Sequence, residues 1–234
     1  MKPLYQRIML KLSGEILAGE SIFCPTVMNR VCQELKVIRD MGVQINVVIG
    51  GGNIFRGNMG QAQGMDRATA DYMGMLATVM NALALQTCMT DMGIDARVMT
   101  SINMNEIAEK FTRRRAFEYM QNGRIVVHAG GIGVPFFSTD TAAASRACEM
   151  NCQAIFKGTK VDGIYSEDPV KSPSAIFYKK LKYQDVLANE LNVMDAAAIS
   201  LAKENRIPVV VFNIKNPGQL AKAICGEGSY TIVS

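Results

Sequence analysis

Glycine-rich strand ends followed by cations are the clearest chemical signal in this chain of 234 residues. The apolar run 47–49 stops at Gly50, Gly51 and Gly52, and Arg56 follows four positions after the last glycine. Glycine lets a backbone come close to a ligand, so this loop suits an anion such as phosphate. Neither G-x-G-x-x-G nor G-x-x-x-x-G-K-[ST] is present, so a different phosphate-binding architecture is expected. For one such triplet, the alternative is a tight strand-to-helix turn.

Two lysines are predicted at strand ends. Lys11 lies just before Ser13 and Gly14, and Lys157 follows the apolar run 154–156. An ammonium group at the end of a core strand loses hydration unless it binds an anion or a carboxylate. The alternative is a lysine whose stem is buried while its ammonium reaches solvent. Together with the glycine loops, these lysines indicate phosphoryl transfer, in which catalysis is mostly positioning and charge neutralisation.

A second glycine-rich segment, 129–134, ends a predicted strand and leads to Ser138, Thr139 and Asp140. These three residue types are good N-caps for the alanine-rich helix that follows. Because backbone N–H groups at a helix N-terminus bind phosphate, a second anion site is expected here. Simple capping is the alternative and needs only one of the three. His128, at the end of this strand, is expected to pack rather than to act as a base.

The segment 159–168 is predicted to form a short hairpin and an irregular loop, where a nucleotide base could pack against Tyr165. Residues 172–180 are polar and are expected to face solvent.

A chain that alternates strands and helices must position these loops. The opening strand, helix and strand predict a βαβ unit and therefore a parallel sheet. No repeat or long linker divides the sequence, which indicates one α/β unit over residues 1–234. The predicted strands are 8–12, 43–49, 94–99, 124–127, 154–156, 208–212 and 230–233. The predicted helices are 26–41, 72–89, 105–121, 142–148, 183–188, 194–205 and 217–225.

The predicted helix 72–89 has 18 residues without a charge, which is the lower limit for a membrane span. Thr78 and Asn81 interrupt it, and strands are predicted on both sides, so a core helix is expected instead. A helix that is apolar on almost all sides must bury apolar residues against the protein core on one side and against something else on the other. A subunit interface is expected on that other side, and replacing Val79 or Leu83 with aspartate would test it.

Composition limits the class of protein. With 49% apolar and 20% charged residues, the chain can bury one full core. The net charge of +4 is compatible with binding either nucleic acid or a small anionic substrate. The chain has no tryptophan, and no aromatic residue separates the arginines 113–115, so a small anionic substrate is favoured over dedicated nucleic-acid binding. Six cysteines without a C-x-x-C pair indicate reduced, buried thiols. Cys148 and Cys152 would share a helix face, but a single histidine argues against zinc. Residues 1–4 lead into a strand without a signal-peptide region, which favours the cytoplasm.

Six segments together resemble the bacterial uridylate kinases of the amino acid kinase superfamily, over nearly the whole chain. They are 11–15, 49–57, 71–81, 135–140, 159–163 and 193–195, which read KLSGE, IGGGNIFRG, DYMGMLATVMN, PFFSTD, TKVDG and VMD. The resemblance implies a three-layer α/β/α sandwich with a mainly parallel central sheet. It implies transfer of the ATP γ-phosphoryl group to UMP, giving UDP for pyrimidine nucleotide biosynthesis. It also implies Mg²⁺ with ATP, a cytoplasmic homohexamer, GTP activation and UTP inhibition.

The resemblance also assigns roles by motif. Lys11 and Arg56 would offset the charge of the transferred group, while Asp140 would orient a lysine or Mg²⁺ rather than act as a base. Asp195 would position the ATP loop or start a helix. Residues 1–150 would bind the acceptor and residues 151–234 would bind ATP. The implied catalytic residues are Lys11, Arg56 and Asp140, without protein ligands to a metal. The implied ATP-binding residues are Lys11, Leu12, Ser13, Gly14, Gly52, Arg56, Thr159, Tyr165 and Asp168. The implied UMP-binding residues are Gly51, Asp71, Ile132, Gly133, Val134, Pro135, Phe136, Phe137, Ser138 and Thr139.

The chain departs from the family pattern in two places. Ile132 and Val134 stand where the family commonly has threonine and asparagine, which are associated with reading uracil, so some turnover of CMP or dUMP is expected. The segment 19–25 is about two residues shorter than the common pattern, in a region associated with GTP activation.

Two other functions are compatible with parts of the sequence. A kinase for a carboxylate or carbamate acceptor is disfavoured by Asp71 and the segment 136–140. A non-catalytic nucleotide-binding protein is disfavoured by Lys11, Arg56 and Asp140, because a site that only binds need not keep cations placed for a transition state.

Overall fold

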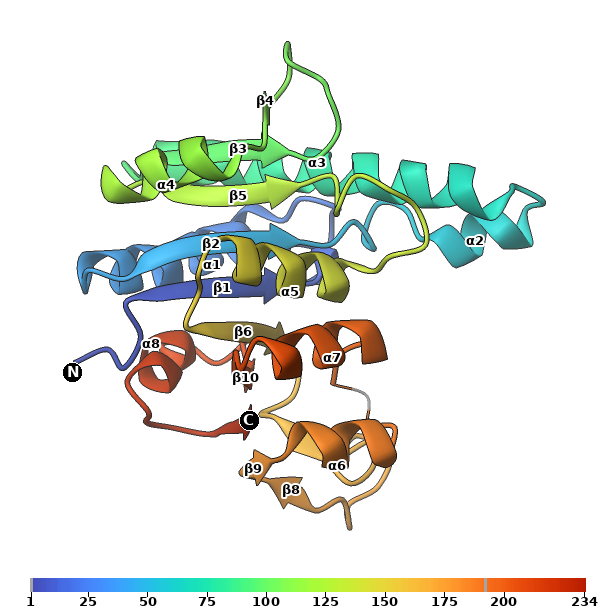
Figure 1. The fold of residues 1–234 in the computed structure, drawn as a ribbon, viewed down its shortest axis with the longest axis vertical. Helices are drawn as coiled ribbons and strands as arrows, with labels where there is room; N and C mark the ends of the chain where they lie inside the picture. The colour runs from blue at the N-terminus through green and yellow to red at the C-terminus, as the bar shows by residue number, and fades with distance from the viewer. Residues whose placement is uncertain (1, 192) are drawn as a thin grey trace.

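The computed structural model describes residues 2–191 and 193–234, so Met1, which the sequence analysis placed before the first strand, lies outside them. A nine-stranded sheet forms its centre, in the order β4-β3-β5-β2-β1-β6-β10-β11-β9 (Figure 1). Neighbouring strands run parallel except for β10 and β11, which confirms a mainly parallel sheet. Its strands are β1 (Arg7–Leu12), β2 (Gln44–Ile49), β3 (Ala96–Thr100), β4 (Glu109–Lys110), β5 (Ile125–Ala129), β6 (Ala154–Thr159), β9 (Lys180–Leu181), β10 (Val209–Asn213) and β11 (Tyr230–Val233).

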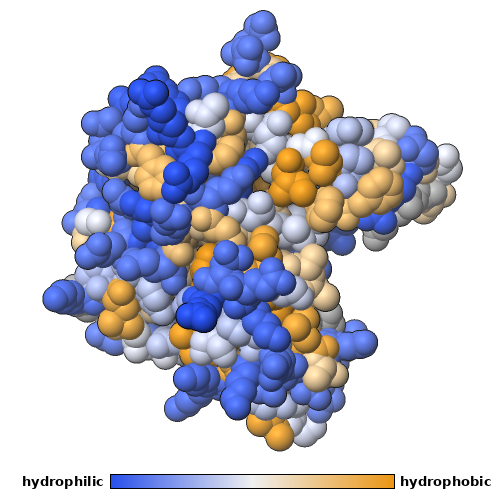
Figure 2. All heavy atoms as spheres, viewed as in Figure 1, coloured by the Kyte–Doolittle hydropathy of each residue, from blue (hydrophilic) through white to orange (hydrophobic). Residues whose placement is uncertain are grey.

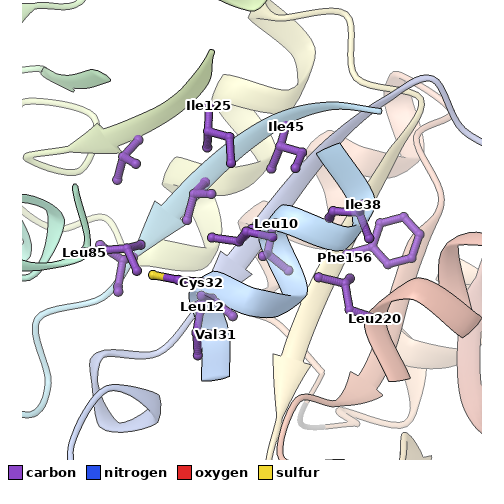
Figure 3. Close-up of a cluster of buried hydrophobic side chains, with 14 of the residues drawn as sticks. Leu10, Leu12, Val31, Cys32, Ile38, Ile45, Leu85, Ile125, Phe156 and Leu220 are labelled. Carbon is purple, nitrogen blue, oxygen red and sulfur yellow. The ribbon is translucent and has the colours of Figure 1, made fainter. Parts of the chain in front are cut away.

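Helices cover both faces of this sheet, which gives three layers. One core lies under α1, α3 and α8, and the other lies under α4, α5, α6 and α7. Figure 3 shows the first core, where Leu10 and Ile45 of the sheet meet Leu85 of α3 and Leu220 of α8. The helices are α1 (Pro25–Asp40), α2 (Gly57–Ala62), α3 (Arg67–Asp91), α4 (Arg113–Gln121), α5 (Thr139–Glu149), α6 (Tyr183–Ala188), α7 (Ala196–Glu204) and α8 (Gln219–Ile224).

Alternation along β1 places its residues on opposite faces of the sheet. Ile8, Leu10 and Leu12 fill the first core, whereas Met9 fills the second. Successive side chains of a strand point to opposite faces, so Lys11 shares the face of Met9. The strand therefore buries its apolar residues on both sides and carries a lysine to its carboxyl end, under α5.

The predicted helix 105–121 is only half correct. Residues 109–110 form the edge strand β4 beside β3, and the backbone N–H of Phe111 bonds to Thr100 O. The helix α4 begins only after Thr112, whose hydroxyl accepts the backbone N–H of Arg115. Pairing with a sheet edge thus competes with helix formation until an N-cap is available.

The predicted hairpin has a more distant second strand than expected. β7 (Ile164–Tyr165) pairs with β8 (Phe177–Tyr178) in a separate two-stranded sheet. The rings of Tyr165 and Phe177 lie 5.2 Å apart, and this aromatic contact joins the two strands. Residues 172–180 were expected to face solvent, and each of them is partly or fully exposed, although they contain β8 and the first residue of β9.

The apolar helix α3 is long and apolar enough to cross a membrane by length and composition, but half of its most apolar window is buried. It packs against α1 and the sheet, as expected of a core helix. Tyr72, Leu76 and Met80 are 45%, 49% and 50% exposed and recur every four residues, so they form one uncovered stripe. Val79 is buried in the first core, so the expectation that it could face a partner was wrong.

The six cysteines are free thiols in this structure. Cys32 and Cys152 are buried, and the other four are partly buried. α5 ends at Glu149, so Cys148 and Cys152 do not share a helix face as the spacing predicted.

Candidate active site

Lys11, Lys157 and Asp140 meet at the carboxyl ends of β1 and β6. Lys11 Nζ lies 2.6 Å from Asp140 Oδ1, and Lys157 Nζ lies 2.9 Å from Asp140 Oδ2. Burial opposes ionisation of Asp140, but the two ammonium groups outweigh it and hold the pKa of this carboxyl below its usual range. Burial and the charge of Lys11 lower the pKa of Lys157, and the carboxylates of Asp140 and Asp195, which act to raise it, offset this only in part. Two cations share one carboxylate here, so the cluster favours an anion beside it.

Strand register brings the two lysines together. Lys11 and Lys157 are direct partners in the parallel pair of β1 and β6, so both side chains leave the same face of the sheet. Two neighbouring ammonium groups repel each other. Asp140, in the first turn of α5, offsets this repulsion because each of its oxygens binds one lysine. The carbonyl of Val193 accepts a further hydrogen bond from Lys157 Nζ.

The N-terminus of α5 is tied to the N-terminus of α7. The Ser138 hydroxyl caps α5 by accepting the backbone N–H groups of Asp140 and Thr141 at 3.0 and 3.1 Å. The hydroxyls of Ser138 and Thr141 both donate to the carboxylate of Asp195. Asp195 also accepts the backbone N–H of Ala198 at 2.8 Å, which confirms its predicted role as a helix start. One carboxylate thus joins two segments that are far apart in the sequence.

A cavity of about 560 Å³, named here the Asp71 cavity, lies between the loop 50–52, α3 and the N-terminus of α5. Figure 2 shows the molecule hollowed between the arm of α2 and α3 and the part that contains α6 and α7. Thr139 and Thr141, the neighbours of Asp140, line the cavity. Of the predicted UMP-binding residues, its lining includes Gly51, Asp71, Phe136, Phe137, Ser138 and Thr139. The lining does not include Ile132, Gly133, Val134 and Pro135.

Asp71 holds the mouth of this cavity in an unusual conformation. Its carboxylate accepts the backbone N–H of Phe136 at 2.8 Å and pairs with Arg67 Nε at 2.8 Å. Phe136 has a φ of 71°, a left-handed conformation that an aromatic residue adopts only at a cost. The guanidinium of Arg67 lies 5.7 Å from the Phe136 ring. These contacts place an exposed aromatic ring beside a carboxylate and a cation.

The glycine loops pack closely against their surroundings. A Cβ at Gly51 would lie 2.7 Å from both Gly74 O and Ala77 Cβ of α3. A Cβ at Gly14 would lie 2.6 Å from Gly50 O. A side chain at either position would clash with its surroundings, and the close packing brings the loops at the ends of β1 and β2 together beside the lysine cluster.

Arg56 turns toward Glu15. Its guanidinium pairs with the Glu15 carboxylate, and its Nε donates to Gly52 O at 3.1 Å. Lys160 Nζ binds the other oxygen of Glu15 at 2.6 Å. Gly52 and Arg56 line the Asp71 cavity. The Arg56 side chain is half exposed, so this ion pair is weak and leaves it free to meet an anion.

A second cavity of about 520 Å³, named here the Tyr165 cavity, lies beside β7 and the segment that follows it. Thr159, Tyr165 and Asp168 line it, and so does Lys157. The lysine cluster therefore stands between the two cavities, with Lys157 facing one and the neighbours of Asp140 facing the other.

The remaining predicted ATP-binding residues lie at the end of β1 rather than in the lining of either cavity. They are Lys11, Leu12, Ser13 and Gly14. The side chain of Leu12 is buried in the first core, so only its backbone can reach a ligand. A Cβ at Gly50 would lie 3.3 Å from Gly14 N and 3.5 Å from Thr139 Oγ1, which places this turn beside the Asp71 cavity.

The predicted site residues include neither Lys157, nor Arg67, nor Thr78, although Lys157 was expected to bind an anion at its strand end. The strand-end position of Lys157 was a usable signal, because it matches that of Lys11 on the adjacent strand. Arg67 and Thr78 carry no comparable signal, since Arg67 precedes the predicted helix 72–89 and Thr78 is one of several polar residues within it. Both line the Asp71 cavity.

His128 lies away from both cavities. It is 3% exposed, and its Nε2 lies 2.9 Å from Asn46 Oδ1. Burial, with a smaller contribution from Arg146, lowers the pKa of His128 to about 3. The prediction that it packs in the core is confirmed.

Comparisons with known proteins agree with this geometry. Residues 6–213 match the Amino acid kinase family. A uridylate kinase of Roseobacter denitrificans is 53% identical over 231 residues, which is 98% of this chain and 96% of that protein. The crystal structure of UMP kinase from Ureaplasma parvum has a TM-score of 0.93 and 34% identity, with 100% of both chains covered. The structure of UMP kinase from Bacillus anthracis has a TM-score of 0.95 and 40% identity, covering 98% of this chain and 96% of that one.

These matches run through the loops at the lysine cluster and both cavities, and they confirm the fold and the resemblance seen in the sequence. The chain therefore belongs to the amino acid kinase family.

Proposed function

We propose that this chain is an ATP-dependent UMP kinase, which transfers the γ-phosphoryl group of ATP to UMP and releases ADP and UDP. The observation that carries the proposal is the cluster of Lys11, Asp140 and Lys157 between two cavities. Two nucleotides that meet phosphate to phosphate need a concentration of positive charge at their junction. The names of the similar uridylate and UMP kinases support UMP as the acceptor.

The chemistry needs little more than charge and position. A phosphate oxygen of UMP is already an anion, so it can attack the γ-phosphorus of ATP without a general base. Lys11 and Lys157 offset negative charge on the transferred group as its bond to ADP breaks. Asp140 is not a base in this scheme, because its pKa is low and each of its oxygens binds a lysine. Its role is to hold the two cations at one point.

The Tyr165 cavity is the proposed ATP site. Thr159, Tyr165 and Asp168 would contact the adenosine. The turn at the end of β1 would contact the phosphates through Lys11, Ser13 and Gly14, with a backbone contribution from Leu12. Gly52 and Arg56 would complete this set from the loop at the end of β2, where Arg56 would leave Glu15 for the more highly charged phosphates.

The Asp71 cavity is the proposed UMP site. Gly51, Asp71 and the segment 132–139 would hold the nucleotide, with the α5 N-terminus toward its phosphate. Asp195 and Ala197 also line this cavity, so the acceptor site would draw on residues beyond the half 1–150.

A divalent metal, proposed to be Mg²⁺, fits this donor set as a partner of ATP. Within residues 2–191 and 193–234, no group of three or more His, Cys, Asp or Glu side chains is placed so that it could hold a metal ion. Mg²⁺ commonly keeps several waters and binds through substrate phosphates, so it does not require such a cluster. The Ser13 hydroxyl makes no capping bond and is available near the phosphates that would hold the ion. When bound, the metal would neutralise charge on the β- and γ-phosphates.

We propose a homohexamer assembled from dimers, with the stripe of Tyr72, Leu76 and Met80 on α3 as an interface. This stripe is apolar and about half exposed in the single chain, which is a costly surface to leave in water. The proposed setting is pyrimidine nucleotide synthesis in the cytoplasm, with GTP activation and UTP inhibition.

Release of ADP in a coupled assay tests the function. ATP and Mg²⁺ are offered with each nucleoside monophosphate in turn, and with a carboxylate and a carbamate. We expect the highest kcat/KM with UMP. Turnover only with the carboxylate or carbamate would identify the other kind of kinase. Nucleotide binding by calorimetry without ADP release from any acceptor would identify a non-catalytic binding protein.

A further inference from the structure

A glycine turn forms part of one wall of the Asp71 cavity. Gly130, Gly131 and Gly133 have φ values of 73°, 57° and 92°, and Gly131 lines the cavity. Glycine populates many backbone conformations with similar ease, so such a turn has little rigidity of its own. Its position relative to a bound acceptor must come from the groups that hydrogen-bond to it.

Helix α3 fixes the first residue of this turn. The backbone N–H of Gly130 donates to Thr78 Oγ1 at 2.8 Å, and the same hydroxyl donates to Met75 O at 2.6 Å. Thr78 and Met75 also line the cavity. This contact holds only the start of the turn.

Ser101, directly after β3, fixes the next residue. Its hydroxyl donates to Gly131 O at 2.8 Å and accepts a hydrogen bond from Arg146 Nη2 at 2.8 Å. With its proton directed to Gly131 and its oxygen bound to a cation, the hydroxyl has a defined orientation. Ser101 O would also lie 3.2 Å from a Cβ at Gly133, so the turn packs against the Ser101 backbone as well.

Arg146 gives Ser101 a rigid support. It is 7% exposed, its guanidinium lies 3.9 Å from the centre of the Phe111 ring, and it pairs with Glu149. Arg146 belongs to α5, whose N-terminus carries Ser138 and lines the same cavity. α5 therefore positions the cavity wall twice, directly at its first turn and indirectly through Arg146 and Ser101.

We infer that Ser101, oriented by Arg146, is a positioning residue for the acceptor nucleotide. This inference rests on the proposed function. Ser101 acts through Gly131, and it does not line the Asp71 cavity itself. Removing its hydroxyl leaves a buried arginine N–H and a carbonyl without this partner and lets the glycine turn shift. Acceptor binding should then weaken, while the Tyr165 cavity, which is built from other segments, keeps its shape.

The variant Ser101→Ala tests the inference by the split between two KM values. We expect KM for UMP, and the Kd of UMP measured by calorimetry without ATP, to rise about tenfold, which corresponds to about 1.4 kcal/mol. KM for ATP should change less than about twofold. Ser101→Thr keeps the hydroxyl and should restore KM for UMP. Ser234→Ala is the matched control, because this exposed serine follows β11 and lies outside the lining of both cavities.

Arg146→Lys provides a second route to the same measurement if Ser101→Ala folds poorly. It keeps a positive charge beside Glu149 but loses the planar group that reaches Ser101, so it should also raise KM for UMP selectively. An unchanged KM for UMP in both variants, or equal rises in KM for UMP and ATP, would overturn the inference. A wild-type chain that does not phosphorylate UMP would overturn the proposed function itself, and the inference with it.

Discussion

Replacing Lys11 with methionine removes a charge from the junction of the two cavities while nearly preserving side-chain length. The lysine is almost buried, and its ammonium lies 2.6 Å from Asp140 Oδ1. Lys157 remains paired with Asp140 at 2.9 Å, and the loss of a neighbouring cation lets its pKa rise. The variant should therefore keep an intact Asp140–Lys157 pair and fold normally.

The expected kinetic loss follows from the charge that is removed. Two unit charges about 4 Å apart interact by about 4 kcal/mol at an effective dielectric constant of about 20. A loss of about 1.4 kcal/mol slows a reaction tenfold, so complete loss of this interaction would lower kcat about 1,000-fold. Lys157, which lies opposite Lys11 on the adjacent strand, would supply part of the lost electrostatic interaction. We therefore expect kcat to fall at least about 100-fold, within the range seen for loss of one electrostatic contact to a transition state.

The assay is steady-state ADP release with saturating ATP and UMP, together with the Kd of ATP from calorimetry. ATP should still bind, because most of its contacts are elsewhere and the lost interaction matters most in the transition state. Lys203→Met is the matched control, since Lys203 is exposed on α7, and it should keep full activity. A Lys11→Met enzyme with more than about a tenth of the wild-type kcat would remove Lys11 from the mechanism.

Three further predictions concern assembly, specificity and pH. Leu76→Asp should dissociate the assembly, as measured by light scattering, with little change in melting temperature. Val79→Asp buries an unpaired charge and should instead destabilise the fold. An unchanged particle size for Leu76→Asp would refute the α3 interface. CMP should be turned over with kcat/KM within about 10⁴-fold of UMP, because Ile132 and Val134 have no side-chain hydrogen-bonding group and do not line the Asp71 cavity. A larger ratio in a competition assay would point to recognition by the backbone. The unfolding free energy should fall as pH falls from about 6.5 toward 3, since burial lowers the pKa of His128 to about 3 and the unfolded chain binds more protons in that window. Urea titrations at pH 7 and 5 should show a smaller fall for His128→Gln, and equal falls in both proteins would contradict this account.

The sequence predicted the elements whose signals are local. Strand β1 follows from alternating apolar residues, α5 from an N-cap at Ser138, and the glycine loops from the abrupt end of apolar runs. Each signal spans a few residues, so it survives without knowledge of the fold. The same local reading failed at residues 105–112, where pairing of β4 with β3 overrides the helical pattern.

The site could be predicted in parts but not as an arrangement. Lys11, Asp140, Asp71 and Tyr165 were all named from motifs, and the structure places each at a cavity or at the cluster between them. Ile132 and Val134 came from the same kind of motif, yet they lie outside the lining of the Asp71 cavity. A motif gives the order of residues along a loop, whereas the turn at the glycines decides which of them face inward.

The α/β class, the strand-end lysines, the helix caps and the excess of apolar residues on α3 follow from the amino-acid sequence, because they depend on residue type and short-range spacing. The partners of those residues follow from the folded arrangement instead. Lys11 meets Lys157 through the register of β1 and β6, Asp195 holds the cap of α5, and Arg146 reaches the glycine turn through Ser101. Each of these contacts joins segments that are distant along the chain, and their geometry is fixed by the packing of the whole sheet and its helices.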